Sequence, residues 1–127
     1  MIRVLLVDDE PAVLEALQLA LAEYGLEVHT AANGARALES LALWRPDVVV
    51  SDWMMPVMDG GRLVRELRRA PALADMPVFL MSALQPPGDL PIDGFLHKPF
   101  GVLQLLRLIY RHAPARPGHV DMRAPER

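Results

Sequence analysis

Residues 47–61 read DVVVSDWMMPVMDGG, an apolar run that ends in a serine and an aspartate and then passes into a loop. The three consecutive valines predict a strand over residues 47–51 that is buried on both faces. The proline and two glycines that follow Asp52 are typical of a loop, and helical spacing resumes over residues 62–70. This stretch therefore predicts a buried strand whose carboxyl end leads through an acidic residue into a loop and a helix.

The alternation of apolar strand and amphipathic helix continues on both sides of this stretch. Further strands are predicted over residues 2–7, 27–31, 77–82 and 94–97. Further helices are predicted from Pro11 to the stop at Gly25, from the cap at Asn33 to Pro46, and over residues 100–112. This order implies an α/β fold, a doubly wound, five-stranded parallel sheet with right-handed crossovers and helices on both faces.

The connection over residues 83–94 departs from this pattern. It reads ALQPPGDLPIDG, and each internal proline removes an N–H donor and disfavours helical geometry in the residue before it. We expect an extended or single-turn segment here, with Leu84, Leu90 and Ile92 as anchors over the edge of the sheet.

Composition limits the classes of function. The chain of 127 residues fits one domain, which we predict over residues 1–112, followed by a poorly ordered tail over residues 113–127. No apolar run approaches the roughly 20 residues of a membrane span. The net charge of −3 and the lack of a long basic run argue against direct binding of nucleic acid. We expect a cytoplasmic protein without membrane contact.

Polar residues stand at the carboxyl ends of four predicted strands. Asp8 and Asp9 follow the first strand, Asp52 follows the third, Ser82 ends the fourth and Lys98 follows the fifth. Ligands of such sheets bind beyond these ends, so the five side chains should meet at one edge. Three carboxylates in one place repel one another, and a hard divalent cation such as Mg²⁺ relieves that cost. Asp52 is the best candidate for a nucleophile toward phosphorus, while Lys98, the only lysine, neutralises charge and Ser82 offers a hydroxyl.

Each of these residues also has a simpler interpretation. Asp9 could cap the helix that begins at Pro11, and Asp52 could open a turn. The single lysine could be a matter of chance. Their joint placement at the ends of different strands favours one shared site over these separate roles.

The motifs at these strand ends resemble those of the receiver domains of response regulators. They are VDDE at residues 7–10, SDWMMPVMDG at 51–60, MSA at 81–83 and KPF at 98–100. The resemblance covers residues 1 to about 112 and implies the flavodoxin-like strand order 2-1-3-4-5. The chain departs from the family in one place, because Ser82 to Lys98 spans fewer positions than usual, so we expect the helix usually found between the fourth and fifth strands to be shortened or absent.

The function implied by this resemblance is that of a phosphoacceptor in a two-component system. Asp8, Asp9 and Asp52 would hold Mg²⁺ together with the backbone carbonyl of Met54. Asp52 would accept a phosphoryl group from a phosphohistidine of a sensor histidine kinase or a histidine phosphotransfer protein. Such a protein is not an enzyme toward other substrates, because it catalyses only its own phosphorylation and dephosphorylation.

The remaining roles concern the response to phosphorylation. The resemblance implies that Ser82 and Lys98 contact the phosphoryl group, and that Pro99 follows a cis peptide bond. Phe95 matches the aromatic residue that turns inward when the hydroxyl residue moves toward phosphate. A downstream protein partner would then recognise the surface around the fifth strand and the last helix.

Other functions, and one mode of assembly, stay open at this point. A receiver fold without its chemistry would be a pure interaction module. A phosphohydrolase with an aspartyl nucleophile generally needs a cap domain, for which the chain has no room. In the last helix, Leu103, Leu108 and Tyr110 widen the apolar arc to about 220°, so a homodimer could form there unless they are ordinary flanking residues.

Overall fold

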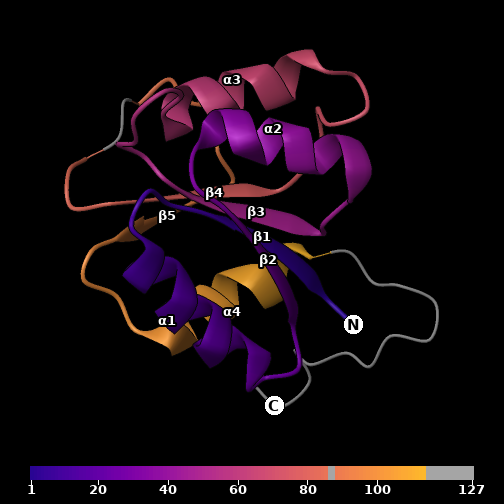
Figure 1. Cartoon of the computed structure of the whole chain (residues 1–127). Coiled ribbons are helices and arrows are strands. Elements are labelled where there is room, and N and C mark those ends of the chain that lie inside the picture. The colour runs from indigo at the N-terminus through magenta and orange to yellow at the C-terminus, as the bar shows by residue number, and fades with distance from the viewer. Residues whose placement is uncertain (86–87, 114–127) are drawn as a thin grey trace.

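The computed structural model describes residues 1–85 and 88–113. Its strands form one parallel sheet in the order β2-β1-β3-β4-β5 (Figure 1). They are β1 (Arg3–Val7), β2 (Glu27–Ala31), β3 (Val48–Asp52), β4 (Val78–Ser82) and β5 (Gly94–His97). The described residues form four helices, α1 (Pro11–Ala22), α2 (Gly34–Leu43), α3 (Gly60–Arg69) and α4 (Val102–His112). The predicted fold class and strand order are confirmed.

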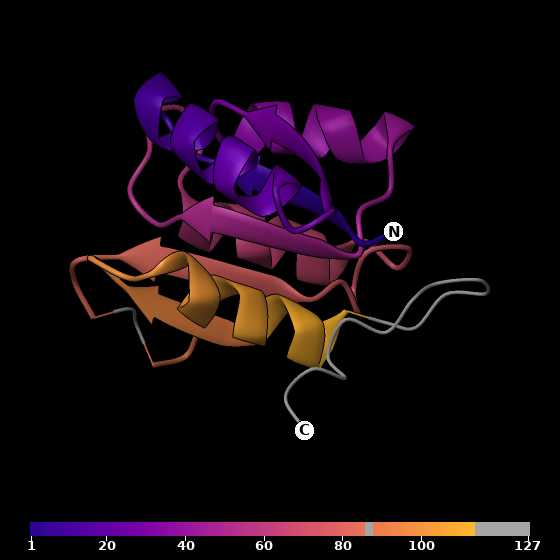
Figure 2. The same cartoon turned by 90° about the horizontal axis from the view of Figure 1, so that it is seen from below.

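Helices cover both faces of the sheet. The pair α2 and α3 lies on one face, and the pair α1 and α4 lies on the other (Figures 1 and 2). Alternate residues of β1 serve the two faces: Val4 and Leu6 belong to the apolar cluster beneath α1 and α4, whereas Leu5 and Val7 belong to the cluster beneath α2 and α3. Because both faces are covered, every residue of β3 and β4 is buried.

Helix termini follow the signals in the sequence. Pro11 is the first residue of α1, where its missing N–H costs no hydrogen bond. The helix itself ends at Ala22, earlier than predicted, and Gly25 adopts the positive φ of 85° that closes the turn behind it. Asn33 caps α2, because its side chain accepts a hydrogen bond from the Arg36 N–H at 2.9 Å.

Two boundaries near the candidate site differ from the prediction. Asp52 is the last residue of β3, paired with Met81 of β4, and not the first residue of the loop. α3 begins at Gly60, two residues earlier than predicted. The reason is the side chain of Asp59, which accepts a hydrogen bond from the Arg62 N–H at 2.9 Å and caps the helix there.

The connection between β4 and β5 has no helix in its described residues, 83–85 and 88–93, as the prolines predict. Leu90 is buried and Ile92 packs against the cluster beneath α2 and α3, so two of the three predicted anchors are confirmed. Leu84 was the wrong choice, since this residue is 58% exposed. Its N–H donates a hydrogen bond to Oγ of Ser82 at 3.0 Å, which holds this residue at the end of β4.

α4 buries more of its apolar residues than the sequence indicates. Leu108 and Tyr110 pack against the cluster beneath α1 and α4, while Leu103 is 55% exposed. The apolar surface for a homodimer through α4 is therefore smaller than expected, and the dimer stays a prediction that sedimentation can check. Of the predicted tail over residues 113–127, Ala113 is described and is buried in the cluster beneath α1 and α4, whereas residues 114–127 lie outside the described residues. Within the described part of the chain, none of the helices is long and apolar enough to cross a membrane.

Candidate functional site

Three carboxylates meet at the carboxyl ends of two neighbouring strands. β1 and β3 pair in parallel with Val7 opposite Ser51, so the next residues, Asp8 and Asp52, lie side by side. One carboxylate oxygen from each of Asp8, Asp9 and Asp52 lies within 4.8 Å of the other two. Asp8 and Asp52 are buried, whereas Asp9 is exposed. The structure thus brings together the three acids that the sequence analysis selected.

Lys98 reaches this cluster from the end of β5. Its Nζ lies 2.6 Å from Oδ1 of Asp52 and 3.9 Å from Oδ2 of Asp8. The backbone N–H of Lys98 donates to the carbonyl oxygen of Ser82 at 2.9 Å, and the peptide bond to Pro99 is cis, as the resemblance implied. Burial alone would lower the pKa of the Lys98 ammonium, but the hydrogen bond and charge of Asp52 outweigh it and raise that pKa.

The surroundings of Asp8 disfavour the ionised form of its carboxyl. Burial raises the pKa of its carboxyl, and the nearby charges of Asp52 and Asp9 raise it further, against a hydrogen bond from the Glu10 N–H and the charge of Lys98. That N–H donates to Oδ1 at 3.0 Å. Oδ2 is buried and has no hydrogen-bond partner among the described residues. A buried carboxylate oxygen of this kind, beside two further carboxylates, fits a hard cation that takes oxygen ligands.

Ser82 and Phe95 complete the set of residues selected from the sequence. Ser82 is buried at the end of β4, next to His97 of β5 in the strand register, and its Oγ accepts the Leu84 N–H. Phe95 is half-buried against the cluster beneath α2 and α3, with its ring 6.3 Å from that of His97 in an edge-on arrangement. Ser82 thus lies on β4 and Phe95 on β5, and the carboxyl ends of these two strands lie beside Lys98. Met54, in the loop after Asp52, has a side chain that is 60% exposed.

The loop between β3 and α3 contains strained backbone that the sequence analysis missed. Val57 has a φ of 71°, and the Met58 N–H donates to the carbonyl oxygen of Pro56 at 2.8 Å, which defines a γ-turn centred on Val57. The carbonyl of Met58 then accepts a hydrogen bond from the Gly34 N–H at 2.9 Å. Positive φ is costly for a β-branched residue, so the surrounding contacts hold this loop in place beside Asp52.

Gly60 is a second residue whose importance was missed. A Cβ atom at this position would overlap the carbonyl oxygen of Asp52 and would lie 3.0 Å from both Leu80 Cδ2 and Trp53 Cα. The Gly60 N–H also donates to the carbonyl oxygen of Trp53 at 2.8 Å. The glycine lets α3 begin directly against the end of β3. The only signal in the sequence was the glycine that closes the SDWMMPVMDG motif.

This arrangement of acids, hydroxyl and lysine agrees with the match to known families. A family model described as the response regulator receiver domain matches residues 4–110. The chain belongs to this family. Response regulator MprA of Mycobacterium sp. (strain KMS) is 38% identical to the receiver domain over 111 residues, which are 83% of this chain and 47% of that protein. MprA of Mycobacterium leprae is 38% identical over 113 residues, which are 84% of this chain and 49% of that protein. This receiver domain therefore spans about half the length of the curated relatives it matches.

Solved structures of similar proteins share the fold. Chemotaxis protein CheY4 of Vibrio cholerae has a TM-score of 0.82 and 32% identity to the receiver domain, over 88% of this chain and 98% of that one. Response regulator TrrA of Thermotoga maritima, solved in complex with Mg²⁺ and BeF, has a TM-score of 0.80 and 32% identity, over 87% and 98% of the two chains. The family assignment made from the motifs is confirmed.

Proposed function

We propose that this receiver domain is the phosphoacceptor of a two-component system, with Asp52 as the residue that is phosphorylated. The observation that carries the proposal is the contact of Asp52 Oδ1 with Lys98 Nζ at 2.6 Å, beside an Asp8 oxygen that is buried without a hydrogen-bond partner among the described residues. The contact with Lys98 keeps a positive charge directly beside the carboxylate of Asp52. The unpartnered Asp8 oxygen supports a Mg²⁺ site, in which Asp8, Asp9, Asp52 and the carbonyl of Met54 would hold the ion.

The proposed transfer needs little more than correct positioning of charge. An oxygen of Asp52 forms a bond to phosphorus, the bond from phosphorus to the imidazole nitrogen of the donor breaks, and its electron pair stays on that nitrogen. Bound Mg²⁺ supplies positive charge to the phosphoryl oxygens. Lys98 neutralises a further part of their charge, and the Ser82 hydroxyl donates a hydrogen bond to one of them. The donor is a phosphohistidine of a sensor histidine kinase or a histidine phosphotransfer protein in the cytoplasm.

The downstream effect is proposed to start at Ser82 and Phe95. When Ser82 turns toward the phosphoryl group, it releases the Leu84 N–H, and Phe95 can turn inward on the neighbouring strand. The surface that changes is formed by β5, α4 and the described parts of the connection, residues 83–85 and 88–93. A protein partner that binds this surface would recognise it without the helix that this family usually places between β4 and β5, since the described residues of the connection form none.

A direct experiment tests the chemistry. The purified chain is incubated with acetyl phosphate, with and without Mg²⁺, and its intact mass is measured. The proposal expects a gain of one phosphoryl group that requires Mg²⁺. A mass that never changes, with acetyl phosphate or with phosphorylated kinases, would favour the interaction module instead. Steady turnover of p-nitrophenyl phosphate would favour the phosphohydrolase.

An Asp8→Asn variant should be more stable than the wild type when Mg²⁺ is absent. The substitution keeps the shape of the side chain but removes a buried charge, so we expect a gain of about 1 kcal/mol in the free energy of unfolding. Wild type should gain about 2.7 kcal/mol from Mg²⁺ at 100 times its dissociation constant, and the variant should lose most of that gain. Thermal unfolding with and without Mg²⁺ measures both effects. Asp75 is exposed, so Asp75→Asn serves as the control. An Asp8→Asn protein that is stabilised by Mg²⁺ as much as the wild type would contradict the ion site.

The lifetime of the phosphorylated form should depend on Met54 and Leu84. These residues lie two positions after Asp52 and Ser82, and both side chains are exposed and apolar, so neither can orient a water molecule that attacks the phosphoryl group. Polar replacements at both positions, Met54→Asn with Leu84→Gln, should speed dephosphorylation by roughly tenfold. Decay of the phosphorylated mass after removal of the donor measures this rate. Leu103→Gln changes an exposed leucine on α4 as a control, and equal decay in all three proteins would refute the prediction.

A further inference from the structure

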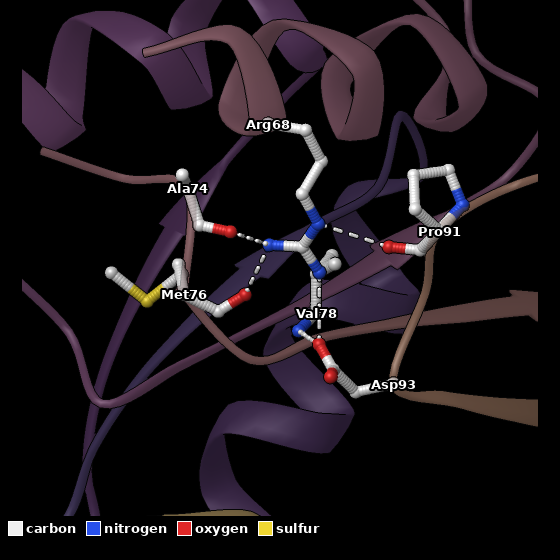
Figure 3. A network of polar contacts seen from close by, with 6 residues as sticks. All are labelled: Arg68, Ala74, Met76, Val78, Pro91 and Asp93. Atoms are coloured by element: carbon white, nitrogen blue, oxygen red, sulfur yellow. Dashed lines mark hydrogen bonds and ion pairs between the residues drawn. The ribbon is translucent and has the colours of Figure 1, made fainter. Parts of the chain in front are cut away.

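The guanidinium of Arg68 joins three segments at the end of the sheet opposite the site. Arg68 lies in the last turn of α3 (Figure 3). Its Nη1 donates to the carbonyl oxygens of Ala74 at 3.0 Å and Met76 at 2.8 Å, in the segment that leads to β4. Its Nε donates to the carbonyl oxygen of Pro91 at 3.0 Å, in the segment that leads to β5. We call these contacts, together with those of Asp93, the Arg68 network.

Asp93 connects this network to the strands themselves. Its Oδ2 accepts hydrogen bonds from Arg68 Nη2 at 2.9 Å and from the Val78 N–H at 2.8 Å. In return, the Asp93 N–H donates to the carbonyl oxygen of Val78 at 2.8 Å. These reciprocal bonds fix the residue before β5 against the first residue of β4. Asp93 therefore sets the register of β5 against β4 at the amino-terminal end of β5. Arg68 in turn holds Asp93 in place.

Arginine suits this position better than any other cation. Its planar guanidinium holds several N–H groups in fixed directions, and here they reach three carbonyl oxygens and one carboxylate. Only 21% of the Arg68 side chain is exposed, so its ion pair with Asp93 is screened less than a pair between fully exposed side chains. Arg69, its neighbour on α3, is mostly exposed and pairs only with Glu66 on the same helix in the described contacts.

Acid–base pairs therefore lie at both ends of β5, Lys98 with Asp52 of β3 at one end and Asp93 with Arg68 of α3 at the other. At one end, α3 begins at Gly60, which is packed against the carbonyl of Asp52, and Lys98 at the end of β5 contacts the Asp52 carboxylate. At the other end, Arg68 of α3 contacts Asp93, which directly precedes β5. β5 is an edge strand of four residues, paired only with β4 within the described sheet. A displacement of its beginning is thus carried along a short strand to Lys98.

We propose that Arg68 is a positioning residue for Lys98. It acts through Asp93 and β5, and it fixes where the ammonium of Lys98 lies relative to Asp52. The described part of the connection between β4 and β5 contains no helix that could set this position by packing on the sheet. The consequence for phosphoryl transfer rests on the proposed function, whereas the effect on the position of Lys98 does not.

The first experiment observes Lys98 directly. Because the chain has one lysine, a protein labelled with ¹³C at the lysine ε-carbon gives a single NMR signal that needs no assignment. Asp52→Asn removes the partner of Lys98 and defines the direction of the expected shift. Arg68→Met and Asp93→Asn should move the signal in the same direction when measured well below their unfolding temperatures. Arg69→Met, on the same helix, should leave it in place.

The second experiment asks whether Arg68 acts through Lys98 during phosphorylation. Arg68→Met should slow phosphorylation by acetyl phosphate by about tenfold, because a small misplacement of a charged group costs much of its effect. In a Lys98→Met background the same substitution should cause no further loss, whereas a general structural defect would add to it.

The outcomes separate cleanly. If Arg68→Met does not fold, Asp93→Asn decides, since it keeps the size of the side chain. A lysine signal that stays in place in the folded Arg68 and Asp93 variants while Asp52→Asn moves it would overturn the proposal. The proposal would also be overturned if Arg68→Met slowed phosphorylation equally in the wild-type and Lys98→Met backgrounds. If the wild type takes up no phosphoryl group, the proposed function fails, and the lysine signal alone still decides the role of Arg68.

Discussion

Replacement of Asp52 by asparagine should abolish phosphorylation of this receiver domain. The amide keeps the shape of the carboxylate but lacks the negatively charged oxygen that would attack phosphorus. It also removes the charge that Lys98 contacts at 2.6 Å and one of the three carboxylates of the cluster. We therefore expect no gain in mass with acetyl phosphate and Mg²⁺, against one phosphoryl group per chain for the wild type.

A nearby acid provides the control for this variant. Asp59 lies in the same loop and caps α3 through its side chain, and asparagine caps a helix about as well as aspartate. Asp59→Asn should consequently keep full labelling. Asp9→Asn should keep Asp52 as the acceptor but require more Mg²⁺, because it removes one ligand and its charge. An Asp52→Asn protein that still gained a phosphoryl group would show that another residue is the acceptor.

The largest loss of stability is expected for Gly60→Ala. The new Cβ would overlap a backbone oxygen of Asp52 and would crowd Trp53 Cα and a side-chain carbon of Leu80. Backbone atoms in the middle of a sheet cannot yield as the end of a flexible side chain can, so α3 or the end of β3 must shift. We expect a loss of about 3 kcal/mol in the free energy of unfolding. Thermal unfolding should show a midpoint lower by roughly 10 °C.

The matched variant for this test is Gly88→Ala. A Cβ at Gly88 meets no atom within 4 Å, so its effect should stay within about 0.5 kcal/mol. Gly60→Ala should also phosphorylate slowly in the folded state, because the carbonyl that is displaced belongs to the acceptor residue. If the two glycine variants unfold at the same temperature, the close approach of α3 to Asp52 is not a constraint on this fold.

Much of the candidate site could be predicted because it follows from the order of the strands. Asp8, Asp52, Ser82 and Lys98 are far apart in the chain, but each stands at or beside the carboxyl end of a buried strand. In a parallel sheet these ends share one edge, so the apolar runs of the sequence are enough to bring the residues together. The absence of a helix in the described residues between β4 and β5 was likewise predictable, because proline limits the backbone locally.

Contacts that depend on three-dimensional packing could not be predicted in this way. Arg68 is one of twelve arginines in the chain, and no local pattern shows that its guanidinium reaches Asp93 and Pro91. The same holds for the positive φ of Val57, which the folded loop imposes on a residue that disfavours it. Leu84 was misjudged for a related reason: an apolar residue in a connection can either cover the sheet or face solvent, and its hydrogen bond to Ser82 decides between them.

The short connection between β4 and β5 also affects the order in which the sheet can assemble. The residues paired between these strands, from Phe79 with Gly94 to Ser82 with His97, have the smallest separation in sequence of the four strand pairs. The chain entropy lost on closing a loop rises with its length, and the described residues of this connection form no helix that would have to nucleate before the two strands can meet. The half of the sheet that holds Ser82 and Lys98 can therefore pair early in folding, whereas β1 and β3 must wait for a longer loop to close.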